Sequence, residues 1–327
     1  MTELAQEAGK PLPSTKHPSI ERLGRKLGIK MTIPAQLLLV FIVTFPALML
    51  IYLSLTWWGP LDGTTWIHAY ESINWFDNYI EIFQDGRLWG SVGRTFLIMA
   101  IVVPIEFLLG LGLAILFVDR FHGKRIFYVI LLMPMMIVPS VAGYMFFMLF
   151  QSNGPINQII SGMTGLEFDV VWLGHPIRSM IAIMVADIWQ WTPLMFLILL
   201  AGIISVPEDQ LKAATLLGAN WIHKFWRIVL PRMKIVMVIA LVIRSVEAFK
   251  LFDIMWIMTK GGPGFSTETI SVYIYKLTFF DLEWAYVSTA GLVIMIFLSL
   301  FAVVGLIAMA RAKRRRLATP DPVRAQG

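Results

Sequence analysis

The sequence contains no cysteine and few charged residues. Among its 327 residues there is no Cys, and Asp, Glu, Lys and Arg together make up 15%. The absence of Cys excludes disulfides and thiolate-bound metal or redox centres. The mean hydropathy is +0.73 and 57% of the residues are hydrophobic, which indicates an integral membrane protein.

The sequence also lacks the motifs of common catalytic and nucleotide-binding sites. It contains no H-E-x-x-H, no G-x-S-x-G and no G-x-x-x-x-G-K-[ST]. The five histidines are scattered through predicted tails and loops: His17, His68, His122, His175 and His223. We therefore expect no enzyme activity, no metal and no bound cofactor. Without a phosphate loop, any use of ATP requires a separate ATPase subunit.

Six apolar runs are long enough to cross a membrane. They lie at about 33–56, 91–118, 126–150, 179–203, 235–258 and 286–310. They predict an all-α polytopic membrane protein with six transmembrane helices in one domain, residues 33–310. The flanking tails are residues 1–32 and the basic residues 311–327. The first tail is either a short basic amphipathic helix or disordered.

Lys and Arg residues predict the orientation of the spans. They gather in both tails, near residues 120–125 and in the loop 204–234, whereas Arg87, Arg178, Lys260 and Lys276 fall on the other side. Both termini and the 204–234 loop are therefore expected in the cytoplasm. The loops at about 57–90, 151–178 and 259–285 are expected outside, where their Trp residues fit an interfacial belt.

The loop segment 205–231 predicts two short helices joined at Gly218. Ser205 can cap the first helix, and Gly218 is a natural left-handed stop. Asn220 can cap the second helix, which we expect to end at Leu230-Pro231. Taken alone, the pattern also describes a helix pair lying on the membrane surface.

Two motifs carry a family resemblance. Ala213-Ala214, Gly218, Ile228 and Leu230-Pro231 have the spacing of the cytoplasmic loop that docks the ATPase in ABC importer permeases. Thr259-Lys260-Gly261-Gly262-Pro263-Gly264, followed by Thr267-Glu268 and Tyr273-Ile274-Tyr275, resembles an outer loop of the maltose-type permeases of carbohydrate importers. The resemblance covers about residues 33–310. One departure is Lys212, where that family has a Glu facing a basic residue of the ATPase.

The resemblance implies a MetI-like fold and a role in moving a sugar or polyol across the bacterial cytoplasmic (inner) membrane. The implied partners are a second, similar permease, two ATP-binding subunits and an extracytoplasmic sugar-binding protein, within membrane lipid and without nucleic acid. The implied coupling residues are Lys212, Ala213, Ala214, Gly218, Ile228, Leu230 and Pro231. Alternatives are an importer of an anionic sugar derivative or polyol phosphate, a proton-coupled secondary transporter, and a membrane-bound enzyme.

Charged residues inside the predicted spans mark the candidate substrate site, because a charge at the bilayer centre costs ~2.5–3.5 kcal/mol unless it is paired or wet. In the maltose-type family the fourth and fifth helices line the sugar site. The resemblance therefore implies these substrate-binding positions: Asp187, Gln190, Trp191, Leu194, Arg244, Glu247, Ala248 and Leu251. The alternative is that Arg244–Glu247 and Lys250–Asp253 are intrahelical ion pairs. Glu106, in the second span, is similarly ambiguous.

Overall fold

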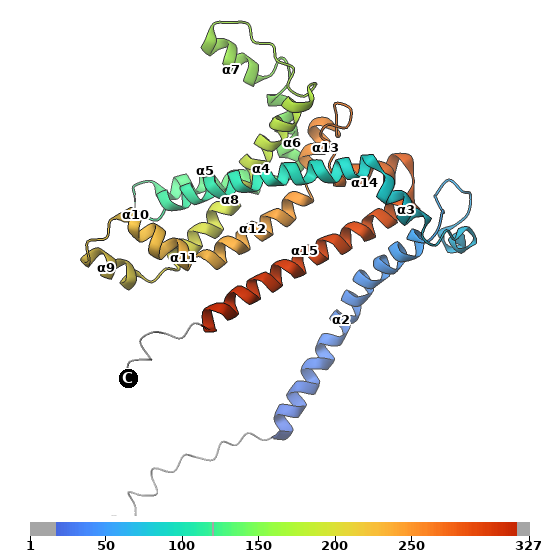
Figure 1. The fold of residues 1–327 in the computed structure, drawn as a ribbon, viewed down its shortest axis with the longest axis horizontal. Coiled ribbons are helices and arrows are strands. Elements are labelled where there is room, and N and C mark those ends of the chain that lie inside the picture. Colours follow the sequence, from blue (N-terminus) through green and yellow to red (C-terminus); the bar gives the residue numbers. More distant parts are fainter. Residues whose placement is uncertain (1–17, 120, 319–327) are drawn as a thin grey trace, which may run out of the picture. The chain divides into compact units, whose positions relative to one another are not determined.

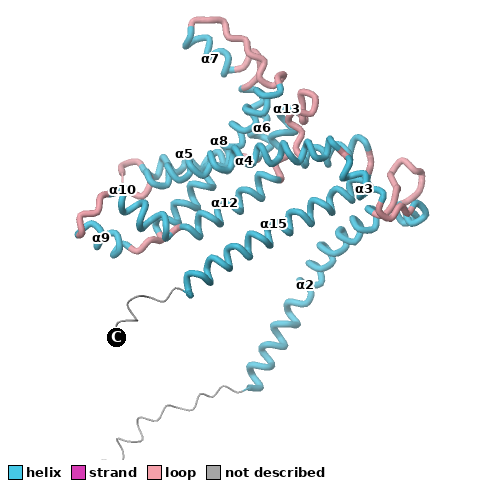
Figure 2. The backbone as a smooth tube through the Cα atoms, in the orientation of Figure 1, coloured by secondary structure: helices cyan, strands magenta, loops and turns pink. Residues whose placement is uncertain are grey.

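The structure is a computed structural model that describes residues 18–119 and 121–318, with side chains for residues 30–119 and 121–300 and for Val303 and Ile307. Within these residues every regular element is a helix, and one isolated antiparallel bridge joins Thr56 to Ile73 (Figure 2). The predicted all-α class is therefore confirmed. The basic residues expected before residue 18 and after residue 318, and Arg120, lie outside the described residues.

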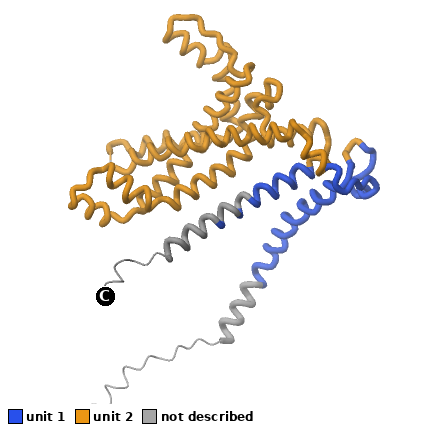
Figure 3. Tube along the Cα trace, in the orientation of Figure 1, with its two compact units in different colours: residues 1–58, 62–78, 288–327 blue, residues 59–61, 79–287 orange. Residues whose placement is uncertain are grey.

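The chain forms two compact units (Figure 3). Unit 1 comprises residues 1–58, 62–78 and 288–327. It contains helix α2 (Pro18–Ser54), the 3-10 helix η1 (Trp66–Ser72) and most of α15 (Trp284–Ala318). The side-chain amides of Asn74 and Asn78 donate to the carbonyl of Thr56 at 2.9 and 2.8 Å, which fixes the chain as it leaves α2.

Unit 2 comprises residues 59–61 and 79–287 and holds the helical bundle. Its elements are α3 (Asp77–Gln84, which begins in unit 1), α4 (Gly86–Leu116), α5 (Lys124–Met136), α6 (Pro139–Leu149), α7 (Pro155–Thr164), α8 (Pro176–Ile204), α9 (Glu208–Leu216), α10 (Trp221–Lys224), the π-helix η2 (Phe225–Val229), α11 (Leu230–Arg232), α12 (Lys234–Phe249), α13 (Asp253–Thr259), α14 (Ile270–Lys276) and the π-helix η3 (Leu277–Asp281). Helix α8 is central and packs on α4, α5 and α12. The α9–α10 segment lies at one end of these helices, and α6, α7 and α13 lie at the other (Figure 1).

A glycine sets the distance between α4 and α8. A Cβ atom at Gly110 would lie 2.7 Å from Cβ of Met195 and 2.8 Å from the backbone nitrogen of Phe196. Only a residue without a side chain allows this approach. The seam between the two helices is consequently well packed, and Met195 and Phe196 are fully buried.

Three helical segments are long and apolar enough to span a membrane: Lys30–Ser54, Gly86–Leu116 and Pro176–Ile204. They match three of the six predicted spans. The predicted span 126–150 is instead two helices, α5 and α6, bent by 96°. Pro139 accounts for the break, because it disfavours a helical conformation at Val138, which has ψ 135°. Counting the bent pair as one span gives four, and the total of six stays a prediction.

The predicted span 235–258 is also interrupted. Helix α12 ends at Phe249 and α13 begins at Asp253, with Leu251 and Phe252 outside both helices. The expectation that Lys250 and Asp253 continue the helix of Arg244 is therefore wrong. The first candidate span, Lys30–Ser54, begins close to the predicted residue 33, within helix α2, which is helical from Pro18.

Candidate functional site

A buried ion cluster joins three helices of unit 2. Arg244 of α12 donates from Nε to Oε2 of Glu106 at 2.6 Å and from Nη2 to Oε1 at 2.9 Å. The same Nη2 also binds Oδ2 of Asp187 on α8. The three side chains are at most 1% exposed. One guanidinium thus ties α4, α8 and α12 together, and its bidentate bond to Glu106 fixes their register.

Two acceptor atoms beside this cluster have no hydrogen-bond partner among the residues that the structure describes. They are Oδ1 of Asp187 and Oε1 of Gln190, one turn apart on α8, and both residues are at most 1% exposed. The amide nitrogen of Gln190 donates to the carbonyl of Ile137 at 2.8 Å. That carbonyl is free because the helix breaks there, so Gln190 lies against the α5–α6 bend. Buried acceptors are usually paired, which makes these two oxygens candidate contacts for a hydroxyl donor.

The other predicted substrate residues fall into two groups. Trp191 and Leu194 are half-buried on α8, and the Trp191 ring centroid lies 5.3 Å from Cζ of Arg244. Ala248 and Leu251 are buried in the hydrophobic core. The structure thus brings Asp187, Trp191 and Arg244 together.

Glu247 is not part of the buried cluster. Its half-exposed carboxylate pairs with Lys250 at 3.0 Å, while Asp253 accepts a hydrogen bond from Ser140 at 3.2 Å. The alternative ion pairs Arg244–Glu247 and Lys250–Asp253 are therefore not formed. Glu106 is the partner that the sequence left undecided. The sequence feature that could have identified Glu106 is a carboxylate deep in an apolar span, because such a group needs a cation from another helix.

The predicted coupling loop forms two helical pieces joined at Gly218, as expected. Gly218 has φ +78°, its amide binds the carbonyl of Thr215, and the amide of Ala219 binds that of Ala214 at 2.9 Å. This is a Schellman C-cap. Asn220 caps the next helix by accepting from the amide of His223 at 2.8 Å, also as expected.

Two local predictions for this loop are wrong. Ser205 does not cap α9. It ends α8, and its hydroxyl donates to the carbonyl of Gly202 at 2.7 Å. Leu230-Pro231 does not end the second helix, because the π-helix η2 and α11 continue to Arg232, and α12 begins at Lys234. The amide of Leu230 reaches back to Phe225, and this π-turn spacing accommodates Pro231.

The loop exposes a set of apolar side chains that we call the apolar knob: Leu216 (89% exposed), Leu217 (88%), Trp221 (56%), Ile222 (59%) and Trp226 (63%). On its other side Leu211, Phe225 and Ile228 pack against the core. Lys212 forms an exposed ion pair with Glu208 at 2.9 Å. The loop is therefore anchored on one face and presents unpartnered apolar surface on the other.

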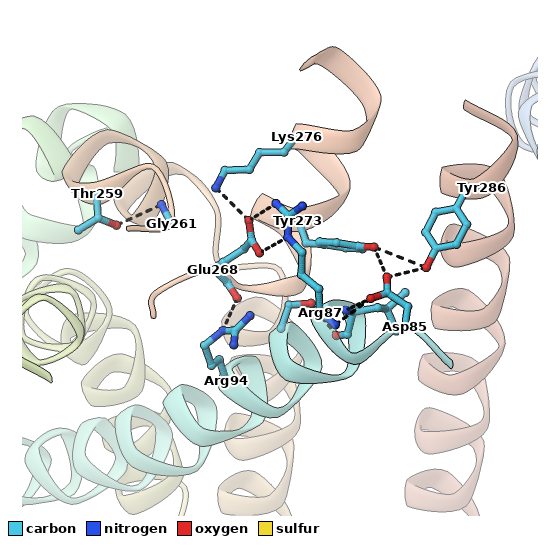
Figure 4. Close-up of polar contacts among 11 residues, drawn as sticks. Asp85, Arg87, Arg94, Thr259, Gly261, Glu268, Tyr273, Lys276 and Tyr286 are labelled. Carbon is cyan, nitrogen blue, oxygen red and sulfur yellow. Dashed lines mark hydrogen bonds and ion pairs between the residues drawn. The ribbon is translucent and has the colours of Figure 1, made fainter. Parts of the chain in front are cut away.

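At the opposite end, Glu268, which follows the Gly-Gly-Pro-Gly motif, faces Arg87 and Arg94 in the first turns of α4 (Figure 4). Glu268 is the centre of this arrangement. Its carboxylate receives two bonds of 2.9 Å from Arg87 and one of 2.9 Å from Lys276, and its carbonyl accepts from Arg94 at 2.9 Å. The hydroxyl of Thr267 donates to the carbonyl of Gly262 at 2.8 Å. Glu268 thus fixes this loop to α4 and α14.

A second carboxylate, that of Asp85, also fixes α14 to the start of α4. Asp85 caps α4 through the amides of Arg87 and Leu88 and accepts from the hydroxyls of Tyr273 and Tyr286. Burial raises the pKa of Asp85, but these four hydrogen bonds outweigh it and the pKa is lowered. Burial likewise raises the pKa of Glu268, and the bonds from Arg87 and Lys276 bring it below its ordinary value. Both carboxylates are therefore held ionised.

Known proteins resemble this chain in sequence and in fold. A family model described as "Binding-protein-dependent transport system inner membrane component" matches residues 85–317. The trehalose/maltose transport system permease protein MalF of Thermococcus litoralis is 32% identical over 226 residues, 66% of this chain and 76% of that protein. The sulfoquinovosyl glycerol transport system permease protein SmoG of Agrobacterium fabrum is 34% identical over 270 residues, 82% of this chain and 85% of that protein.

A solved structure has a similar fold. It is a chain of a bacterial ABC transporter involved in the import of the acidic polysaccharide alginate. The TM-score is 0.73 at 18% sequence identity, and the match covers 93% of this chain and 100% of that chain.

The long apolar helices, together with the match to a transport-system family and to a permease relative, identify a membrane transport subunit. The chain belongs to the family of binding-protein-dependent transport system inner membrane components. The predicted importer-permease family, its fold and its place in the inner membrane are thereby confirmed.

Proposed function

We propose that the chain is one permease subunit of an ATP-driven importer that carries a neutral sugar or polyol. The relatives named for trehalose/maltose and sulfoquinovosyl glycerol transport support a sugar-type cargo. Because sulfoquinovosyl glycerol carries a sulfonate, these relatives support the sugar class and not its charge. The observation that carries the proposal is the pair of unpartnered acceptors on Asp187 and Gln190, next to Trp191. Sugar hydroxyls donate to such oxygens, and an indole covers the apolar face of a sugar ring.

The two acceptors are sealed in this conformation. Gln190 is bound to the carbonyl of Ile137 at the α5–α6 bend. A movement of α6 about that bend would release the Gln190 amide. Gln190, Asp187 and Trp191 would then face the cargo together. Leu194, Arg244, Glu247, Ala248 and Leu251 remain predicted members of the site.

The charge arrangement favours a neutral cargo over an anionic one. Arg244 already binds two carboxyl groups through Nε and Nη2. An acidic sugar or polyol phosphate would therefore approach carboxyl groups instead of a free cation. The same bonds disfavour a proton relay, since Glu106 and Asp187 are both committed to Arg244.

Coupling to ATP hydrolysis would occur at the apolar knob. A set of exposed Leu, Ile and Trp side chains needs a partner surface, and ATPase subunits supply one in this proposal. From Trp221 of the knob the backbone runs through α10, η2, α11 and α12 to Arg244 with a single non-helical residue, Met233. A displacement of the knob would therefore reach the buried cluster along helical backbone.

The remaining partners follow from the same proposal. A second permease subunit would complete the membrane pathway, and an extracytoplasmic binding protein would deliver the cargo to the loops around the Gly-Gly-Pro-Gly motif. A related solved structure is described as an alginate ABC transporter in complex with an alginate pentasaccharide-bound periplasmic protein. Both termini and the knob would lie in the cytoplasm, as the Lys/Arg distribution predicts.

The test is uptake by the complete importer in proteoliposomes. The panel pairs neutral cargos (maltose, trehalose, glucose and mannitol) with anionic ones (glucuronate and mannitol phosphate), each presented with the cognate binding protein. We expect ATP-dependent uptake of a neutral member that survives a protonophore. Uptake of anionic members alone, or uptake that the protonophore abolishes, contradicts the proposal.

A further inference from the structure

A cavity of about 330 Å³ lies at the base of the α7 segment, at the end of unit 2 opposite the knob. Its walls include Phe147, Phe150 and Trp172, and its rim includes Gln151, Ser152 and Asn153. None of its described lining residues is charged. Its volume is at the low end of the ~300–1,000 Å³ found for small-molecule sites, which suits a single ring.

The aromatic wall of this cavity is held rigidly. The Trp172 ring nitrogen donates to Oδ1 of Asn157 at 2.8 Å, and the ring packs edge-to-face on Phe150 at 5.4 Å. Asn157 is 2% exposed and donates in turn to the carbonyls of Ser152 and Val170 at 2.8 and 2.9 Å. The buried amide of Asn157 thus holds together the chain before α7, at Ser152, and the chain after it, at Val170, and fixes the orientation of the indole. A fixed, half-buried indole is a preformed platform for an apolar ring face.

The polar rim, in contrast, is uncommitted. Within the described residues the side-chain amides of Gln151 and Asn153 make no hydrogen bond, and both residues are exposed. Each amide offers an acceptor oxygen and two donor hydrogens, the pattern that matches a pair of neighbouring hydroxyls. Charged side chains, which would select an acid or an amine, are missing from the described rim.

We infer that this cavity is a second, low-affinity subsite for one ring of a neutral sugar, placed at the extracytoplasmic mouth of the permease. The C–H face of the ring would lie on Trp172, and its hydroxyls would bond to Gln151 and Asn153. The subsite is distinct from the Asp187–Gln190 pair and rests on the proposed function for the identity of its ligand. Its role would be to hold the cargo between release from the binding protein and passage into the bundle.

The test uses the complete importer labelled with 5-fluorotryptophan and reconstituted in nanodiscs. The Trp172 fluorine signal is assigned by its loss in Trp172→Phe. The neutral members of the uptake panel are titrated without binding protein. We expect one of them to shift the Trp172 signal saturably, and Gln151→Ala/Asn153→Ala to weaken the apparent affinity about tenfold, as loss of two hydrogen bonds predicts. Glu167→Ala, an exposed change on the same segment outside the cavity, should leave the titration unchanged.

The outcomes separate the subsite from the proposed function. Uptake of a neutral sugar with no Trp172 response to any panel member overturns the subsite and leaves the function standing. A Trp172 response without neutral uptake contradicts the function and keeps the subsite. A signal that moves with loaded binding protein but not with free sugar makes the cavity a protein contact and also overturns the inference.

Discussion

Arg244 is the residue on which three helices depend. Its guanidinium is 1% exposed and faces two buried carboxyl groups from different helices. Removing one side of such a cluster leaves charge in a medium that cannot solvate it, at a cost of ~3–5 kcal/mol. The cluster is therefore a structural element whatever cargo the bundle carries.

We predict that Arg244→Met lowers the unfolding midpoint and the yield of the purified complex, because Glu106 and Asp187 lose their common cation. The destabilisation should be ~3–5 kcal/mol. The matched control is Lys250→Met, whose ion pair with Glu247 is half-exposed and worth at most ~1 kcal/mol. Adding Glu106→Gln and Asp187→Asn to Arg244→Met should restore part of the loss. Equal midpoints for the two single variants would contradict this reading.

A second prediction concerns pH and the outer loop. Asp85 and Glu268 have lowered pKa values in the folded protein, so the stability they contribute is present at neutral pH. The stabilisation contributed by Glu268 begins to decrease once the pH falls below 4.5, the ordinary pKa of this side chain. It is lost as the pH falls through the lower pKa that Glu268 has in the folded protein. The difference in thermal midpoint between wild type and Glu268→Gln should shrink on acidification. A difference that stays constant with pH would count against the role of Glu268.

The sequence allowed some residues to be assigned and not others. Gly218 and Asn220 were predicted correctly, because a positive φ and an N-cap depend on a few neighbouring residues. Arg244 was recognised as a buried charge, yet its partners were not, since Glu106 is 138 residues away in the chain. Only the packing of α4 against α12 brings the two together.

At the scale of the element, the predicted coupling loop depends on a single left-handed residue. Gly218 has φ +78°, and a Cβ there would meet no atom within 4 Å. The cost of a substitution is therefore the backbone conformation, about 1–2 kcal/mol for a residue that resists positive φ.

We predict that Gly218→Val uncouples transport, whereas Gly218→Asn, which tolerates positive φ, retains most of it. The measurement is uptake per assembled complex, with the ATPase activity of the same preparation. The two permeases should still assemble in both variants. Normal uptake by Gly218→Val would show that the elbow geometry is not required.

A further prediction at this scale tests the apolar knob. Leu216 and Leu217 are 89% and 88% exposed, so Leu216→Asp and Leu217→Asp should not affect folding of the subunit. Burial of one Leu in a partner is worth ~1.5–3 kcal/mol, so each change should weaken ATPase association roughly tenfold to a hundredfold. Met163→Asp, at an 83% exposed position on α7, is the matched control and should leave association unchanged. Unchanged binding by both Leu variants would remove the knob as the docking surface.

The helices themselves were predicted better than their interruptions. Hydropathy located the long helices α4 and α8, because apolar composition over some 20 residues is a strong signal. It missed the 96° bend after α5 and the gap between α12 and α13, since each break lies inside a segment long and apolar enough on average to be predicted as one span. Pro139 marked the first break, although proline is often accommodated in packed membrane helices.

At the scale of the whole molecule, the orientation in the membrane is the main prediction. The absence of Cys makes single-cysteine labelling direct. We expect Asp209→Cys to react only after the cells are opened, and Glu167→Cys to react with a membrane-impermeant maleimide in intact cells. Both positions are exposed in the structure. The reverse pattern of labelling would place the knob outside and exclude its use by a cytoplasmic ATPase.

The shared guanidinium of Arg244 also limits how unit 2 can deform. Sliding α12 past α4 by one residue, ~1.5 Å, would break the bidentate contact with Glu106. Helices α4, α8 and α12 should therefore move as a rigid body through the transport cycle. The segments beyond the two backbone breaks, α6 and α13, pack on each other and on α8, and they are then the parts that can move relative to this body. Gln190 lies on α8, where this rigid body meets α6, and its amide binds the carbonyl of Ile137 at the α5–α6 bend. This hydrogen bond is therefore the first that a movement of α6 would release.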